Sequence, residues 1–108
     1  MLKTRFDKSK AELRHNGTVY ALQTFSREET SSDLSNGWAF LKKGMKIDPH
    51  CHPEKEIYIF ISGRGYMWIE REKANVKKGD AIYVPPNLVH TAENEEDKDL
   101  EFIWIKFH

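Results

Sequence analysis

Short apolar blocks separated by turn residues constrain the fold of this chain more than any other feature. In the C-terminal two thirds, such blocks cover residues 38–43, 57–61, 66–72, 81–84, 88–94 and 100–107, with Gly, Pro, Asn or charged residues between them. They are rich in Ile, Val, Tyr, Phe and Trp, and many alternate with a period of two, which is the pattern of β-strands. Many short strands at short intervals are typical of a β-sandwich or barrel. The sequence therefore predicts an all-β fold.

The N-terminal third adds a hairpin and a loop to this prediction. Asn16-Gly17 lies between two possible strands within residues 10–25, and Asn-Gly is the pair that best tolerates the backbone of a tight hairpin turn. Residues 26–37 are polar, and Ser26 and Glu29 have the spacing of a capping box over at most one short helical turn. We expect a surface loop there. No repeat or linker divides residues 1–108, so we expect one domain.

Charge and composition limit the classes of function. Lys and Arg together number 17, as do Asp and Glu, so the chain has a formal net charge of zero and lacks the positive field of a nucleic-acid-binding protein. The longest apolar run, Ile57 to Ile61, is too short to cross a membrane, and no signal-peptide pattern follows Met1. Cys51 is the only cysteine. We expect a cytoplasmic protein that binds neither nucleic acid nor membrane.

A first cluster of metal-ligand residue types lies in the middle of the chain. It consists of Gly44, His50, His52, Glu56 and Gly63. Residues two apart on a strand point to the same face, so His50 and His52 can reach one ion from one side while Cys51, between them, points away. If the next strand runs back alongside, Glu56 adds a carboxylate. Two imidazoles and one carboxylate suit a divalent transition metal.

A second cluster likewise combines ligand-type residues with glycine or proline. It consists of Gly79, Pro85, Asn87, His90 and Asn94. We expect tight turns at residues 79–80 and 85–87, followed by a strand that starts near His90. This strand can bring a third imidazole to the site.

Together the two clusters resemble the two motifs of the cupin superfamily: Gly, His-x-His, Glu, Gly, and then Gly, Pro-x-Gly, His, Asn. The short segment of residues 64–78 between motif 1 (44–63) and motif 2 (79–94) is similar to that of small single-domain cupins of bacterial and archaeal type, the cupin 2 conserved barrel. The resemblance implies a double-stranded β-helix, the jelly-roll or cupin barrel. The family usually has glycine where this chain has Asn87, and asparagine is the other residue that best accepts a left-handed backbone.

The resemblance also implies a metal centre. His50, His52, Glu56 and His90 match the family's ligand positions, and the ion would be a divalent transition metal: Fe, Mn, Ni, Co, Cu or Zn. We expect the three motif glycines, Gly44, Gly63 and Gly79, to form turns rather than to contact a ligand. Cys51 is expected to be a small packed residue on the outer face. His15 and His108 are expected to be solvated.

The residues around this centre suggest a small cavity and a second subunit. Counting in twos from Glu56 places Tyr58 and Phe60 on the inner face and the isoleucines at 57, 59 and 61 on the outer one. Because both faces are apolar, we expect the outer face to be covered by the N-terminal strands or by the partner in a homodimer. No Arg or Lys is assigned to an inner position, so we expect a small, flat or partly apolar ligand. The aromatic candidates for the inner wall, most of them expected to be ordinary core residues, are Trp38, Phe40, Tyr66, Trp68, Phe102 and Trp104.

Two classes of function follow from the resemblance. The first is a metal-dependent enzyme acting on a small organic molecule. It would be a dioxygenase if iron or manganese binds O₂ beside an enolate, or an isomerase or lyase if the ion polarises a carbonyl. Tyr58 would then be the nearest proton donor. The alternative is a non-catalytic module that binds a sugar or another small effector.

Overall fold

The computed structural model describes all residues, 1–108, and the predicted all-β fold is confirmed. A 3-10 helix at Lys8–Lys10 and the one-turn helix α1 (Arg27–Thr30) are the only helices, and neither is long or apolar enough to span a membrane. The strands are β1 (Glu12–Arg14), β2 (Val19–Gln23), β3 (Leu34–Leu41), β4 (Lys55–Ser62), β5 (Arg64–Ile69), β6 (Glu72–Lys77), β7 (Ala81–Val84), β8 (His90–Glu93) and β9 (Leu100–Phe107).

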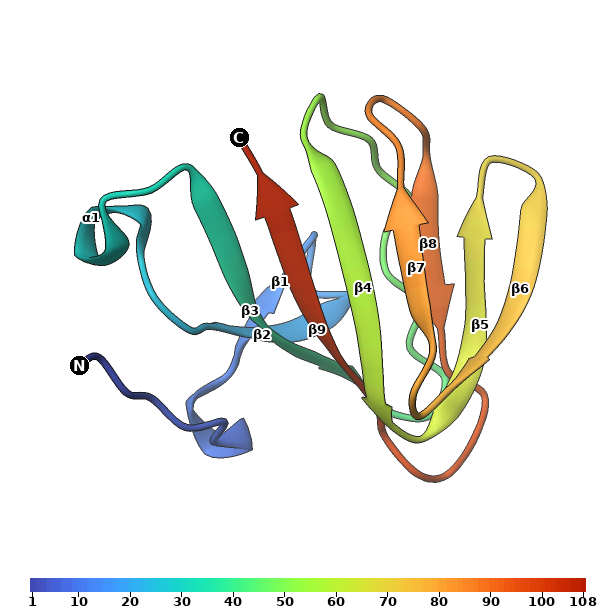
Figure 1. Ribbon diagram of the computed structural model, residues 1–108. Coiled ribbons are helices and arrows are strands. Elements are labelled where there is room, and N and C mark those ends of the chain that lie inside the picture. The colour runs from blue at the N-terminus through green and yellow to red at the C-terminus, as the bar shows by residue number, and fades with distance from the viewer.

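These strands form two antiparallel sheets (Figure 1). The larger sheet has the order β1-β2-β3-β9-β4-β7, and the smaller has the order β6-β5-β8. Residues 44–50 extend the smaller sheet, because bridges at Lys46–Glu93 and His50–His90 pair this segment with β8. The core lies between the sheets and joins Phe60 and Phe102 of the larger sheet to Met67 and Val76 of the smaller one. This is the predicted double-stranded β-helix.

Several local predictions are confirmed in detail. The hairpin pairs β1 with β2 around a turn in which Asn16 and Gly17 have positive φ. Ser26 and Glu29 form a capping box at the start of α1. The three motif glycines at 44, 63 and 79 also have positive φ. At Gly63 a side chain is excluded for a second reason, because a Cβ atom would overlap the carbonyl oxygen of Asp99.

The strand predicted over residues 66–72 is wrong, because two strands share this region. β5 ends at Ile69, a turn at Glu70 and Arg71 follows, and β6 runs back beside β5 over its full length. Glu and Arg are not typical turn residues, and β6 is polar, with Val76 as its only buried side chain. β3 also begins earlier than predicted, at Leu34, because it pairs with β9 as far as Phe107.

Most of the six aromatic residues proposed for the inner wall lie elsewhere. Trp38 stacks on Phe6 of the N-terminal segment, with ring centroids 5.4 Å apart, and Phe40 stacks on Tyr20 at 4.9 Å. Both therefore lie on the outer face of the larger sheet. Tyr66 and Trp68 are half-buried on the outer face of the smaller sheet, beneath the ammonium group of Lys73. Only Phe102 and Trp104 line an internal cavity.

Candidate metal centre

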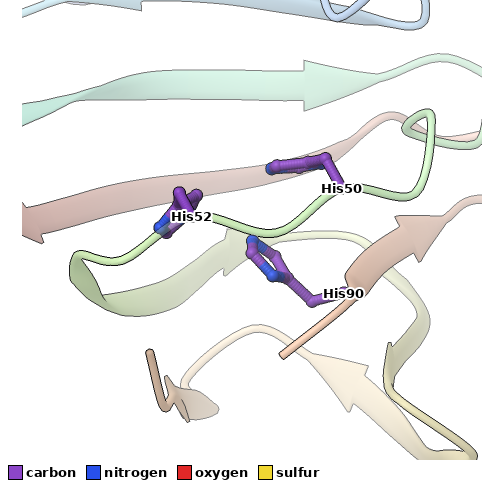
Figure 2. A group of neighbouring side chains, drawn as sticks. All are labelled: His50, His52 and His90. Atoms are coloured by element: carbon purple, nitrogen blue, oxygen red, sulfur yellow. The ribbon is translucent and has the colours of Figure 1, made fainter. Parts of the chain in front are cut away.

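Backbone pairing between the two motifs brings the predicted ligands together. His50 and His90 face each other across a bridge and exchange backbone hydrogen bonds of 3.3 and 2.9 Å. The backbone N–H of Asn87 donates to the carbonyl oxygen of His52 at 2.8 Å, so the turn before β8 is tied to motif 1 as well. The expectation that His50 and His52 lie on a regular strand is wrong, because residues 51–54 are an irregular segment leading into β4. The two imidazoles nevertheless turn to one side of that segment (Figure 2).

Each imidazole is oriented by the same kind of contact. In all three rings Nδ1 lies close to a backbone carbonyl oxygen two residues away. Because a carbonyl oxygen can only accept, Nδ1 carries the hydrogen, and in the neutral ring Nε2 is then the nitrogen with the lone pair. The acceptors are Asp48 for His50 at 2.9 Å, Glu54 for His52 at 3.0 Å and Leu88 for His90 at 2.9 Å.

The carboxylate of Glu56 lies beside two of these imidazoles. Its Oε1 atom is 3.1 Å from Nε2 of His52 and 3.2 Å from Nε2 of His90. Neutral imidazoles in this tautomer turn lone pairs toward the carboxylate, an arrangement that becomes favourable only with a cation between them. Ligand atoms about 3 Å apart also suit an ion whose bonds to nitrogen and oxygen are about 2.1 Å.

The three histidines form a cluster that can hold a metal ion. One ligand nitrogen from each of His50, His52 and His90 lies within 4.8 Å of the other two. Figure 2 shows the rings converging from the segment before β4 and from the start of β8. All four residues proposed from the motifs are therefore neighbours in space.

Burial and neighbouring charges set the ionisation states that metal binding requires. Burial lowers the pKa of His50 to about 4, so its imidazole is neutral at neutral pH. Burial alone would raise the pKa of Glu56, but the close contact with the His90 imidazole and the charge of Lys106 outweigh it and hold that pKa below its ordinary value. A neutral imidazole and an ionised carboxylate are the forms that bind metals.

A cavity of about 200 Å³ adjoins the cluster, and seven of its 14 lining residues are hydrophobic. His50 and Glu56 form part of its wall, together with Tyr58, Phe102 and Trp104. The ring of Tyr58 stacks on Phe102 with centroids 4.8 Å apart. Burial, reinforced by the charge of Glu56, raises the pKa of Tyr58 well above its ordinary value. The phenol therefore keeps its proton and can donate it in a hydrogen bond.

Three basic residues of the wall are absent from the sequence-based site. His15 is exposed, as expected, but its ring also stacks on that of His50 with centroids 4.0 Å apart. Arg14 and Lys106 also line the cavity, so the expectation that no basic side chain faces inward is wrong. Lys106 could have been found by counting in twos from Phe102 through Trp104. No sequence signal places His15, because its position depends on a left-handed turn (φ 51°).

Two further residues lie at the periphery of the site. His108 is exposed, as expected, but it also makes contacts: its Nε2 atom is 2.6 Å from Oγ of Ser35, and its Nδ1 atom is 3.6 Å from Oε1 of Glu54. Cys51 is not part of the histidine cluster, and it is exposed rather than packed on the outer face. No thiol therefore belongs to the candidate centre.

Comparison with known proteins agrees with this fold. The family model of the cupin domain matches residues 37–106, and the chain therefore belongs to the cupin family. An uncharacterised protein of Methanocaldococcus jannaschii is 35% identical over 108 residues, which is 99% of this chain and 86% of that protein.

Solved structures agree over nearly the whole chain. A cupin 2 conserved barrel domain protein from Salinispora arenicola has a TM-score of 0.88 and 21% identity, covering 100% of this chain and 89% of its own. A predicted oxalate decarboxylase from Thermotoga maritima has a TM-score of 0.83 and 24% identity, and the match covers 96% of this chain and 98% of that one. These likenesses confirm the cupin barrel that the motifs indicated.

Proposed function

We propose that this protein binds a divalent transition metal through His50, His52, Glu56 and His90 and acts on a small organic molecule in the adjoining cavity. The observation that carries the proposal is the convergence of three imidazoles and one carboxylate beside the cavity. Each imidazole already has Nδ1 turned to a carbonyl oxygen, which is the tautomer that leaves Nε2 for a metal. No apolar core needs such a group of inward-facing lone pairs, whereas a metal ion does.

The chemistry would be that of a dioxygenase or of an isomerase or lyase. A bound ion would supply Lewis acidity toward a carbonyl or enolate oxygen and, if it is iron or manganese, access to O₂ chemistry. The chain itself supplies the remaining groups. Tyr58 would donate a hydrogen bond to the reacting oxygen, and Phe102 and Trp104 would exclude water from one side of the cavity.

A non-catalytic binding module is the second candidate, and one observation favours it. Beside the four ligands, the wall holds only His15 as a side chain that can accept a proton at neutral pH, and His15 is stacked on a ligand. Tyr58 is a donor at that pH and cannot act as a base. A site with a metal and hydrogen-bond donors but no free base suits the binding of a small effector.

Metal analysis followed by two activity assays separates these candidates. We expect about one divalent ion per chain in purified protein by elemental analysis. Oxygen uptake in air with 1,3-diketones such as acetylacetone would identify a dioxygenase, and proton–deuterium exchange next to a carbonyl would identify an isomerase or lyase. Stoichiometric metal without turnover in either assay would favour the binding module. Protein that takes up no divalent ion would contradict the proposal.

A further inference from the structure

Two basic side chains line the cavity without an acidic partner. Arg14, at the end of β1, and Lys106, near the end of β9, both contribute to the wall. None of the ion pairs in the structure includes either residue, whereas Lys8 and Lys43 each pair with a carboxylate at 2.8 Å. Positive charge beside a cavity is thus left uncompensated.

The carboxylate opposite Lys106 forms no ion pair with it. Glu56 is the cross-strand neighbour of Lys106, and the two side chains share the inner face of the larger sheet. However, Oε1 of Glu56 contacts His52 and His90, and no Glu56 oxygen lies within 4.0 Å of the lysine ammonium. Glu56 is also the only carboxylate of the wall. A divalent ion bound by Glu56 would make the cavity more positive still.

An aromatic surface lies beside these charges. The six-membered ring of Trp104 covers Gly37 on the neighbouring strand so closely that a Cβ atom there would overlap it. The guanidinium carbon of Arg14 is 5.9 Å from the centroid of the indole. Phe102 and Tyr58 continue the aromatic wall toward the histidines. The cavity therefore offers a flat apolar surface with cations at its edge.

We propose that the ligand of this cavity is a small organic carboxylate with a flat, apolar body, whose charge is recognised by Lys106 and Arg14. The inference rests on the proposed metal-dependent function and names its substrate class. A volume of about 200 Å³ lies below the usual range for drug-sized ligands, so the body is small. The half-apolar wall suits an organic anion better than inorganic phosphate, which has no apolar part.

Binding of matched charged and neutral probes tests this inference. Calorimetry on zinc-loaded protein would compare benzoate with benzamide, which share a shape but differ in charge, and inorganic phosphate would be a third probe. We expect benzoate to bind at least about tenfold more tightly than benzamide, because a charge-assisted contact has no counterpart in the amide. Lys106→Met should lose most of this preference, and Arg14→Met part of it. Lys78→Met removes an exposed lysine outside the cavity and should leave the preference unchanged.

Metal content, measured in the same samples, keeps this inference separate from the proposed function. Zinc bound by both the parent and Lys106→Met, with equal affinities for benzoate and benzamide, would overturn the carboxylate inference alone. Preferential binding of phosphate, no binding of benzoate, or an unchanged preference in the Lys106→Met, Arg14→Met double variant would also overturn it. A parent protein that binds no zinc contradicts the proposed function. In that case, a benzoate preference in the metal-free protein would still support the role of the two cations.

Discussion

At the scale of single residues, the candidate centre is held in shape before any ion binds. Each Nδ1–H donates to a carbonyl oxygen of the same local segment, and these contacts fix both the tautomer and the direction of the ring. Such outer contacts usually raise the basicity of a metal-binding imidazole and determine its orientation. The four donors therefore lose little side-chain freedom when a metal binds, which favours affinity.

The depressed pKa of His50 predicts a pH dependence in the metal-free protein. The unfolded chain takes up a proton at His50 near 6.5, but the folded chain does so only near 4. The free energy of unfolding should therefore fall as the pH drops from about 6.5 to about 4. The free energy of unfolding, measured with urea in the presence of a chelator, should depend less steeply on pH in His50→Gln than in the parent. Identical dependences would mean that burial does not hold His50 neutral.

The contact between Gly37 and Trp104 predicts a localised packing defect. A Gly37→Ala variant places a methyl group where the indole lies and should destabilise the fold by about 1–3 kcal/mol through overpacking. In a Trp104→Leu background the same substitution should cost much less. A double-mutant cycle by thermal or urea unfolding measures this coupling. Additive effects of the two substitutions would show that the ring does not require the glycine.

At the scale of elements, one turn joins the two motifs. Pro85, Pro86 and Asn87 lead into β8, and the N–H of Asn87 is bonded to the carbonyl oxygen of His52. Asn87 has φ 64°, so the left-handed backbone expected from the family's glycine is retained. The turn therefore sets the start of the His90 strand and also supports the irregular segment that carries His52.

Substitutions at Asn87 should change stability and metal affinity together. Asn87→Gly should be neutral or slightly stabilising, because glycine adopts positive φ without strain. Asn87→Val should cost about 1–2 kcal/mol and weaken metal binding, since a β-branched residue resists this backbone. Thermal melts with and without added zinc measure both effects. If the valine variant melts with the parent and keeps its metal, the turn does not depend on a left-handed residue.

Some of these elements could be predicted from the sequence, and others could not. The strands at 81–84 and 100–107 were predictable because Gly, Pro, Asn or charged residues bound their apolar runs. β6 was not predictable, because its sequence is polar. It is held by pairing with β5 and by a single buried valine. The four candidate ligands could be predicted from their spacing within the two motifs. His15 and Arg14 could not be predicted, because they reach the cavity wall only when the β1–β2 hairpin folds beside it.

At the scale of the whole molecule, the outer face of the larger sheet is only partly covered. Phe6 of the N-terminal segment packs on Trp38 over β3. Toward β4 and β7 the same face presents Ile57 and its cross-strand neighbour Tyr83, whose side chain is 52% exposed. Because the formal net charge is zero, copies of the chain do not repel one another at long range. We propose that a second copy covers this face in a homodimer.

The homodimer should bury more than about 1,000 Å² in total and persist at tens of micromolar protein. Light scattering should then give about twice the chain mass of 12.7 kDa. Tyr83→Glu should shift the population toward monomer, because it places a charge in the apolar contact. Val89→Glu changes another exposed apolar residue, next to β8 of the smaller sheet, and is the control outside this face. A parent protein that scatters as a single chain would contradict this assembly.

The central claim is that the two motifs of this barrel bind one metal ion, and metal stoichiometry tests it most directly. Elemental analysis after incubation with a divalent ion and removal of the excess should find about one ion per chain in the parent protein. His108→Ala removes an imidazole outside the cluster and should keep that stoichiometry. The His52→Ala, His90→Ala double variant should retain less than about a tenth of it, with a circular dichroism spectrum that still reports a β-rich fold. Full occupancy in that folded double variant would contradict the account.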